Sequence, residues 1–124
     1  MRLLLDTHAA LWLLSEDERM PTSARALVFD ESVDCFLSAA SVWEVAIKRS
    51  MGKLNAPANF HVLLEQHGVT SLPVYDSHAA AVADLPLHHR DPFDRMLVVQ
   101  AQADGMPILS KDEILHAYDV TVLW

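Results

Sequence analysis

The chain has 124 residues, with 9 Lys and Arg against 17 Asp and Glu, and a formal net charge of −8 at pH 7. This length predicts one compact domain over residues 1–124, and the acidic charge argues against broad non-specific adhesion to nucleic acid or anionic membranes. The apolar runs fall short of the roughly 20 residues needed to cross a bilayer, and the start lacks a signal-peptide pattern, so we expect a cytoplasmic protein with no membrane partner.

The first half of the chain alternates short apolar runs with helical patterns. Apolar residues predict strands over 3–5 and 35–37, with Cys35 as a buried thiol, and helical spacing predicts helices over 8–14, 22–31, 39–51 and 60–67. Gly52 follows the third of these helices and Gly68 the fourth, as expected at helix ends.

The second half repeats the alternation. We expect strands over 69–72, 106–109 and 120–123, an alanine-rich helix from Asp76 to Leu85, and a helix that begins at Asp91-Pro92 and ends near Gly105. Short apolar strands that alternate with helices are typical of a parallel sheet covered on both faces. The sequence therefore predicts a three-layer α/β/α fold with a central, mainly parallel sheet of four to five strands.

Two predicted strands end on the same arrangement of an acid with a hydroxyl. The first is Leu5-Asp6-Thr7, and the second is Leu109-Ser110-Lys111-Asp112. The carboxyl ends of parallel strands share one edge, so Asp6 and Asp112 can meet there. Either acid alone is also explained as a helix cap, but the repetition weakens that explanation.

Two further acids lie on predicted helices. Asp94 falls in a first turn, near the apolar face that contains Val98 and Ala101, and its alternative explanation is a first-turn acid paired with an arginine. Glu44 is the only acid of its helix, and Lys48 stands four residues later, at the spacing of a surface ion pair. Considered together with the acids at the strand ends, Asp94 and Glu44 favour a metal site over these separate explanations. Carboxylates without matching His or Cys spacing suit Mg²⁺ or Mn²⁺, and such sites carry out phosphoryl chemistry.

With these motifs in order, the chain resembles a PIN domain, and more narrowly the VapC-type ribonuclease toxins of bacterial toxin–antitoxin pairs. The resemblance covers essentially the whole chain. Its most specific parts are the Leu-Leu-Asp-Thr opening at 4–7, Ser-Val-Trp-Glu at 41–44, and His-His-Arg-Asp-Pro-Phe-Asp-Arg at 88–95 continuing into Gln-Ala at 100–101.

The resemblance implies metal-dependent endonucleolytic hydrolysis of RNA. Asp6, Glu44 and Asp94 would be the core metal-binding catalytic acids, and Asp112 the fourth and more variable one. Thr7 and Ser110 would hold carboxylates or metal-bound water by hydrogen bonds. The implied partners are the RNA substrate, a cognate antitoxin protein and a second copy of the chain in a homodimer.

Several cations and histidines near these motifs have less specific signals. Arg90, Arg95 and Lys48 are candidates to contact the RNA backbone, although solvated charge explains any one of them. His88-His89 invites a zinc interpretation, but adjacent histidines in an extended loop point apart and lack a second ligand pair, so we expect structural or substrate-side residues. The helix around Leu11-Trp12 is apolar on too many sides for one small domain to cover, which predicts a partner surface.

Two alternatives compete with the nuclease. A phosphoacceptor receiver domain would have a similar length and a lysine after a late strand, as Lys111 is, but it would need paired acids after its first strand, where this chain has Asp6 alone. A non-catalytic PIN-fold module that binds RNA or protein would keep the scaffold without turnover. The presence of all four acids argues against that module.

Overall fold

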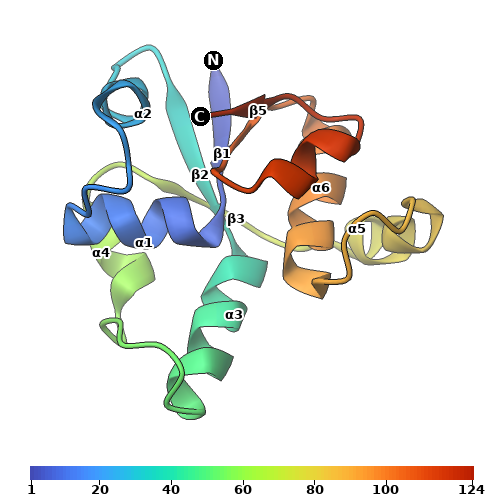
Figure 1. Cartoon of the computed structure of the whole chain (residues 1–124), viewed down its shortest axis with the longest axis horizontal. Helices are drawn as coiled ribbons and strands as arrows, with labels where there is room; N and C mark the ends of the chain where they lie inside the picture. Colours follow the sequence, from blue (N-terminus) through green and yellow to red (C-terminus); the bar gives the residue numbers. More distant parts are fainter.

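A computed structural model describes residues 1–124 as a parallel sheet with helices on both faces (Figure 1). The strands are β1 (Arg2–Leu5), β2 (Asp34–Ser38), β3 (Thr70–Leu72), β4 (Ile108–Leu109) and β5 (Val122–Leu123). The helices are α1 (Thr7–Ser15), α2 (Thr22–Val28), α3 (Ala39–Ser50), α4 (Phe60–Gln66), α5 (Asp76–Ala81) and α6 (Pro92–Asp104), with 3₁₀ turns η1 (Val82–Asp84) and η2 (Glu113–Ala117). None of these helices combines the length and apolar character needed to span a membrane.

The side chains of β1 divide the core into two layers. Leu3 and Leu5 point to one face, where they pack with buried residues of α1, α2, α3 and α4. Leu4 points to the other face, where it packs with α6, including Leu97 and Val98. All three leucines have no exposed surface. The period-two alternation of the strand thus separates two helical layers, and the predicted three-layer α/β/α fold is confirmed.

The sheet has the order β3-β2-β1-β4-β5, and every neighbouring pair is parallel. The chain builds outward from β1 through β2 to β3, then returns to the other side of β1 with β4 and β5. In open α/β sheets, ligands bind where the strand order reverses, outside the carboxyl ends of the strands. Here that reversal lies between β1 and β4, which are followed by Asp6 and Ser110.

Three local features differ from the sequence pattern. The alanine-rich helix expected to end at Leu85 is α-helical only to Ala81 and continues as the 3₁₀ turn η1. The helix expected to reach residues 30–31 ends at Val28, because the Asp30 carboxylate accepts hydrogen bonds from the amide and hydroxyl of Ser32 and forms a turn instead. The polar turn expected after β4 continues into η2, whose first turn is capped by Asp112. This 3₁₀ turn was not predicted, and it fixes the backbone that carries the last of the candidate acids.

Candidate active site

The Asp6 carboxylate performs two functions with its two oxygens. Oδ1 caps α1 by accepting a hydrogen bond from the Ala9 amide at 2.6 Å, while Oδ2 accepts one from the Ser110 hydroxyl. The side chain lies at the junction of β1 and α1 and is almost fully buried. Burial raises the pKa of Asp6, and the hydrogen bonds from Ser110 and Ala9 oppose that rise.

Glu44 lies one turn into α3 and faces the junction of β1 and α1. Its exposed fraction is 3%, and Thr7 Oγ1 lies 2.7 Å from Glu44 Oε1 and 2.9 Å from Ser41 Oγ. The Thr7 hydroxyl has one hydrogen and the Glu44 carboxylate can only accept, so Thr7 donates to Glu44 and accepts from Ser41. Glu44 Oε2 forms an ion pair with Lys48, and this hydrogen bond raises the pKa of Lys48. The expected (i, i+4) pair is therefore present, but its acid is buried.

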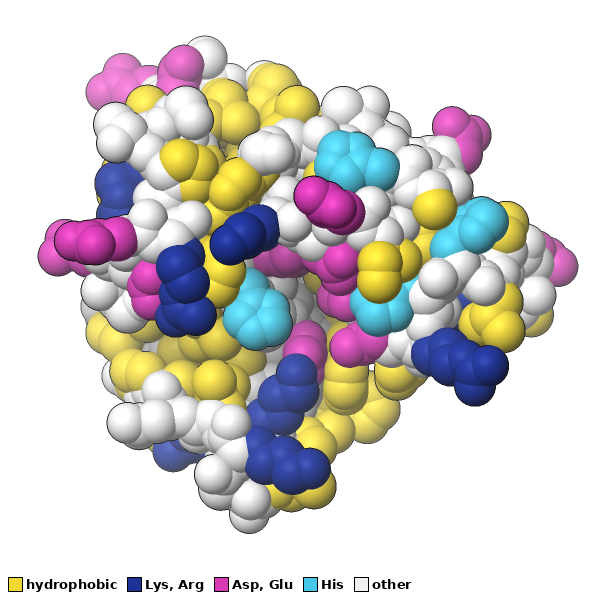
Figure 2. Space-filling view, viewed as in Figure 1, with side chains coloured by type: hydrophobic (Ala, Val, Ile, Leu, Met, Phe, Trp, Pro, Cys, Tyr) yellow, Lys and Arg dark blue, Asp and Glu magenta, His cyan; other side chains and the backbone are white.

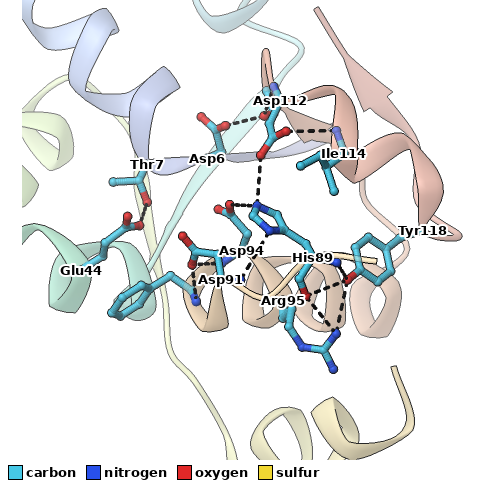
Figure 3. A network of polar contacts seen from close by, with 12 residues as sticks. Asp6, Thr7, Glu44, His89, Asp91, Asp94, Arg95, Asp112, Ile114 and Tyr118 are labelled. Carbon is cyan, nitrogen blue, oxygen red and sulfur yellow. Dashed lines mark hydrogen bonds and ion pairs between the residues drawn. The ribbon is translucent and has the colours of Figure 1, made fainter. Parts of the chain in front are cut away.

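Asp94 is presented by a helix start that Asp91 and Pro92 define. Asp91 caps α6, since its Oδ1 accepts from the amides of Phe93 at 2.8 Å and Asp94 at 3.1 Å, and Pro92 occupies the first helical position. This leaves the Asp94 side chain free to face the other acids (Figure 3). Burial, followed by the negative charges of Asp91, Asp6 and Glu44, raises the pKa of Asp94 to about 7.

Asp112 follows β4 and caps η2 by accepting from the Ile114 amide at 3.0 Å. Its own amide donates to Ser110 Oγ at 2.9 Å, and Ser110 in turn donates to Asp6. The fully buried Ser110 hydroxyl therefore links the ends of β1 and β4. Asp112 is the most open of the four acids, with a side chain that is 33% exposed.

His89, expected to be a structural or substrate-side residue, lies directly against two of the acids. Its Nε2 lies 3.0 Å from Asp94 Oδ2 and 3.4 Å from Asp112 Oδ2. Its neighbour His88 points elsewhere and packs against the Tyr118 ring. The one signal in the sequence was that His89 belongs to the short loop leading directly into the Asp91 cap.

The three predicted substrate contacts lie in different surroundings. Lys48 is at the site through its pair with Glu44, and Arg90 is exposed on the loop before α6. The guanidinium of Arg95 is instead committed to the protein. It donates to the carbonyl oxygens of Val82, Leu85, Pro86 and His89 and to the Tyr118 hydroxyl, at 2.9 to 3.4 Å.

The assembled side chains suit a divalent cation with a preference for oxygen. Asp6, Glu44, Asp94 and Asp112 come from the end of β1, from α3, from α6 and from the segment after β4, and Figure 3 shows them turned toward a common space. Like charges raise the pKa of Asp94, so a cation placed among these carboxylates relieves their repulsion. Carboxylate oxygens are ligands that Mg²⁺ and Mn²⁺ accept, with waters completing the coordination.

Comparison with known families decides between the candidate folds. The family model described as PIN domain matches residues 3–120. The chain belongs to the PIN domain family. A phosphoacceptor receiver domain belongs to a different family, so this membership excludes the receiver alternative. A comparison with curated protein sequences finds no match.

Solved structures share the fold across nearly the whole chain. VapBC2 from Rickettsia felis, solved bound to a promoter DNA fragment, is 9% identical with a TM-score of 0.71, covering 99% of this chain and 98% of that one. FitAcB from Neisseria gonorrhoeae is 19% identical with a TM-score of 0.61, covering 98% and 96%. FitAB bound to the IR36 DNA fragment is 20% identical with a TM-score of 0.59, covering 98% and 93%. At these identities the likeness establishes the common fold.

Proposed function

We propose that this PIN domain is a Mg²⁺- or Mn²⁺-dependent endoribonuclease of the VapC type, the toxin of a toxin–antitoxin pair. The observation that carries the proposal is the convergence of Asp6, Glu44, Asp94 and Asp112 from four separate parts of the chain. Helix capping explains single acids, but it gives no reason for four of them to share one space. The reaction is hydrolysis of an RNA phosphodiester bond by water.

Asp6, Glu44 and Asp94 would hold the metal ion, with Asp112 as the fourth acid. The bound ion would supply Lewis-acid stabilisation of the charge that develops on the phosphate oxygens. Thr7 orients Glu44 through its hydrogen bond to Oε1, and Ser110 orients Asp6 through Oδ2. Hydroxyl groups that hydrogen-bond to ligand carboxylates in this way orient the ligands and tune the bound metal.

Binding of RNA depends on local charge, since the chain as a whole carries −8. Figure 2 shows Lys and Arg side chains around the acidic cluster on this face. Lys48 at the Glu44 carboxylate and the exposed Arg90 are the proposed contacts to the RNA backbone. Arg95 serves the site indirectly, because its guanidinium holds the loop that contains His89.

The proposed partners are an antitoxin protein and a second copy of the chain, in the cytoplasm. A surface hollow beside α1 is lined in part by Leu11, Trp12 and Leu14, and it is the proposed place for an apolar antitoxin segment. The similar VapBC2 and FitAB structures are two-component complexes, which supports such a partner. On the other side, Trp43 is 63% exposed and its ring packs edge-on against Phe93, which makes this face the proposed dimer contact.

The test is cleavage of total RNA by the purified chain, freed of any antitoxin, with Mg²⁺ or Mn²⁺ and with EDTA as a control. Asp6→Asn and Asp94→Asn should each reduce cleavage by a factor of about 10³ or more, because each removes a ligand charge at the reacting centre. Asp76→Asn, which alters an exposed acid of α5, should cleave like the wild type.

Two outcomes would reject the proposal. Cleavage that survives both substitutions, or survives chelation, would exclude the four-acid mechanism. A chain that binds the metal and RNA but cleaves nothing would be a non-catalytic PIN-fold binding module. Preparing the Asp6→Asn protein in parallel controls for a contaminating ribonuclease, because the contaminant would be equally present in both preparations.

A further inference from the structure

The His89 imidazole lies between the carboxylates of Asp94 and Asp112. Its Nε2 is 3.0 Å from Asp94 Oδ2 and 3.4 Å from Asp112 Oδ2. We propose that the His89 imidazole occupies the place of a second metal ion between these two carboxylates, so that the site binds a single divalent cation. This inference rests on the proposed function, because it concerns how many ions the nuclease site holds.

The geometry leaves no room for an ion beside the ring. A Mg²⁺ ion lies about 2.0–2.1 Å from each oxygen that coordinates it. Nε2 is already within hydrogen-bond distance of both Oδ2 atoms, so an ion that bridged them would meet the ring nitrogen and its hydrogen. The ring must therefore move away, become a ligand, or exclude the ion.

The hydrogen bond at Nδ1 disfavours the ring becoming a ligand. Nδ1 accepts from the Asp91 amide at 3.4 Å, so in the neutral ring the hydrogen is on Nε2. A nitrogen that carries a hydrogen cannot coordinate a metal, and a histidine ligand ordinarily donates its other N–H to an acceptor. Here the other nitrogen already faces a donor. The Nε2 side of the His89 ring thus faces Asp94 and Asp112 in ion-pair contacts.

The backbone of His89 is fixed on both sides, which disfavours movement of the ring. Its amide donates to the Tyr118 hydroxyl at 2.8 Å, and its carbonyl accepts from the Arg95 guanidinium at 3.4 Å. Arg95 also binds the carbonyls of Leu85 and Pro86, so the whole loop is attached to α6. The imidazole reaches the carboxylates from a supported backbone (Figure 3).

The remaining acids then serve one ion. The charges of Asp6 and Glu44 act on Asp94. The charge of Asp112 acts on Asp6, but its side chain is the most exposed of the four and its Oδ2 contacts His89. Asp6, Glu44 and Asp94 form the single-ion site. Asp112 is held at its rim, and His89 is a positioning residue that separates the two.

The experiment counts Mn²⁺ ions bound to the full chain, by calorimetric titration and by the electron paramagnetic resonance signal of free Mn²⁺. The wild type should bind one ion. His89→Ala and His89→Ser remove the ring and should bind two. His89→Gln, which keeps an N–H donor near the position of Nε2, should bind one, and so should the control His88→Ala.

Each contrary result has a distinct meaning. Two ions in the wild type, or one ion in both His89→Ala and His89→Ser, would overturn the inference and leave the nuclease proposal standing. Directly coordinated ¹⁴N in the electron spin echo spectrum of the wild type would also overturn it, because His89 would then be a ligand. A wild type that binds no ion would overturn the proposed function itself. The wild-type count and spectrum decide the matter even if the variants fail to fold.

Discussion

The Thr7 hydroxyl lies 2.7 Å from Glu44 Oε1 and joins the end of the first strand to the middle helix across 37 residues of sequence. Both side chains are buried, with 5% and 3% exposure. A buried carboxylate requires partners for its oxygens, and Glu44 obtains one from Thr7 and the other from Lys48. This contact sets the direction in which Glu44 faces Asp94.

Replacing Thr7 by Val should therefore weaken both the fold and the metal site. The substitution keeps the shape but leaves Glu44 Oε1 without a donor, which costs about 1–3 kcal/mol in the free energy of unfolding. Mn²⁺ affinity should fall by a factor of about 10–100, as for other residues that orient metal ligands. Urea unfolding and Mn²⁺ titration measure the two effects. Thr7→Ser restores the hydroxyl and should restore both, so equal defects in the two variants would contradict this role.

Lys48 should behave as a partner of Glu44 that a metal ion can replace. In the metal-free protein, Lys48→Met leaves a buried carboxylate with only one partner and should lower the free energy of unfolding by about 1–2 kcal/mol. The loss is kept small because the Lys48 side chain is 38% exposed. Saturating Mg²⁺ should recover most of it, so the rise in Tm on adding Mg²⁺ should be larger in the variant than in the wild type.

The control for Lys48 is Lys53→Met, which changes an exposed lysine beyond the end of α3. It should alter neither the metal-free stability nor the response to Mg²⁺. If Lys48→Met lowered stability equally with and without Mg²⁺, the lysine would stabilise the fold by packing rather than by pairing with Glu44.

The stability of the metal-free protein should fall as the pH rises from about 4 to about 7. The pKa of Asp94 is raised from 3.8 to about 7, mainly by burial, so the folded state binds the proton more tightly than the unfolded state. The stabilisation from this proton is complete below the unfolded value and is lost as the pH passes the folded value. Urea unfolding in EDTA at pH 5 and pH 8 measures the difference.

Asp94→Asn tests the assignment of this pH dependence to one group. The amide cannot ionise, so the fall between pH 5 and pH 8 should shrink, and at pH 8 the variant should melt about 5 °C above the metal-free wild type. Mn²⁺ affinity of the wild type should rise over the same range, because the ion binds the ionised carboxylate. An unchanged pH dependence in Asp94→Asn would assign the effect to another group.

Substitution of Arg95 should affect mainly the stability of the fold, whereas substitution of Arg90 should affect mainly the binding of RNA. Arg95→Met leaves the carbonyls of the loop before α6 without their donor and should lower the free energy of unfolding by about 2–3 kcal/mol. Arg90→Met should stay within about 0.5 kcal/mol of the wild type, because Arg90 is exposed. Binding of RNA to the inactive Asp6→Asn background should show the reverse order, with a loss on removal of Arg90. Equal stability of the two variants would contradict the assignment of Arg95.

The fold and the positions of the acids were predictable because they follow from local patterns. Alternating helices and apolar strands indicate a parallel sheet, and a parallel sheet brings the ends of its strands to one edge. What local patterns leave open is whether an acid such as Asp6 caps a helix or faces the site. The structure shows both, because each oxygen of Asp6 has its own partner.

Contacts made through irregular loops were the part that the sequence did not indicate. His89 reaches Asp112 across 23 residues of sequence, through a loop whose path depends on Arg95 and Tyr118. The spacing of apolar residues cannot predict the path of this loop, because loop residues have no regular spacing. The role of Arg95 could not be predicted for the same reason. An arginine next to an acid in the sequence gives no sign that its guanidinium binds backbone carbonyls.

The hydrogen bond from Ser110 to Asp6 spans 104 residues, and β1 obtains its second neighbour only from β4, with Leu4 paired to Ile108. During synthesis on the ribosome, the first strand therefore waits until β4 has been made before its second edge is covered. A nascent chain that stops before β4 lacks Asp112, the Ser110 hydroxyl and one side of the central strand. For the proposed nuclease, this order of assembly delays completion of the four-acid site until β4 and Asp112 have been made.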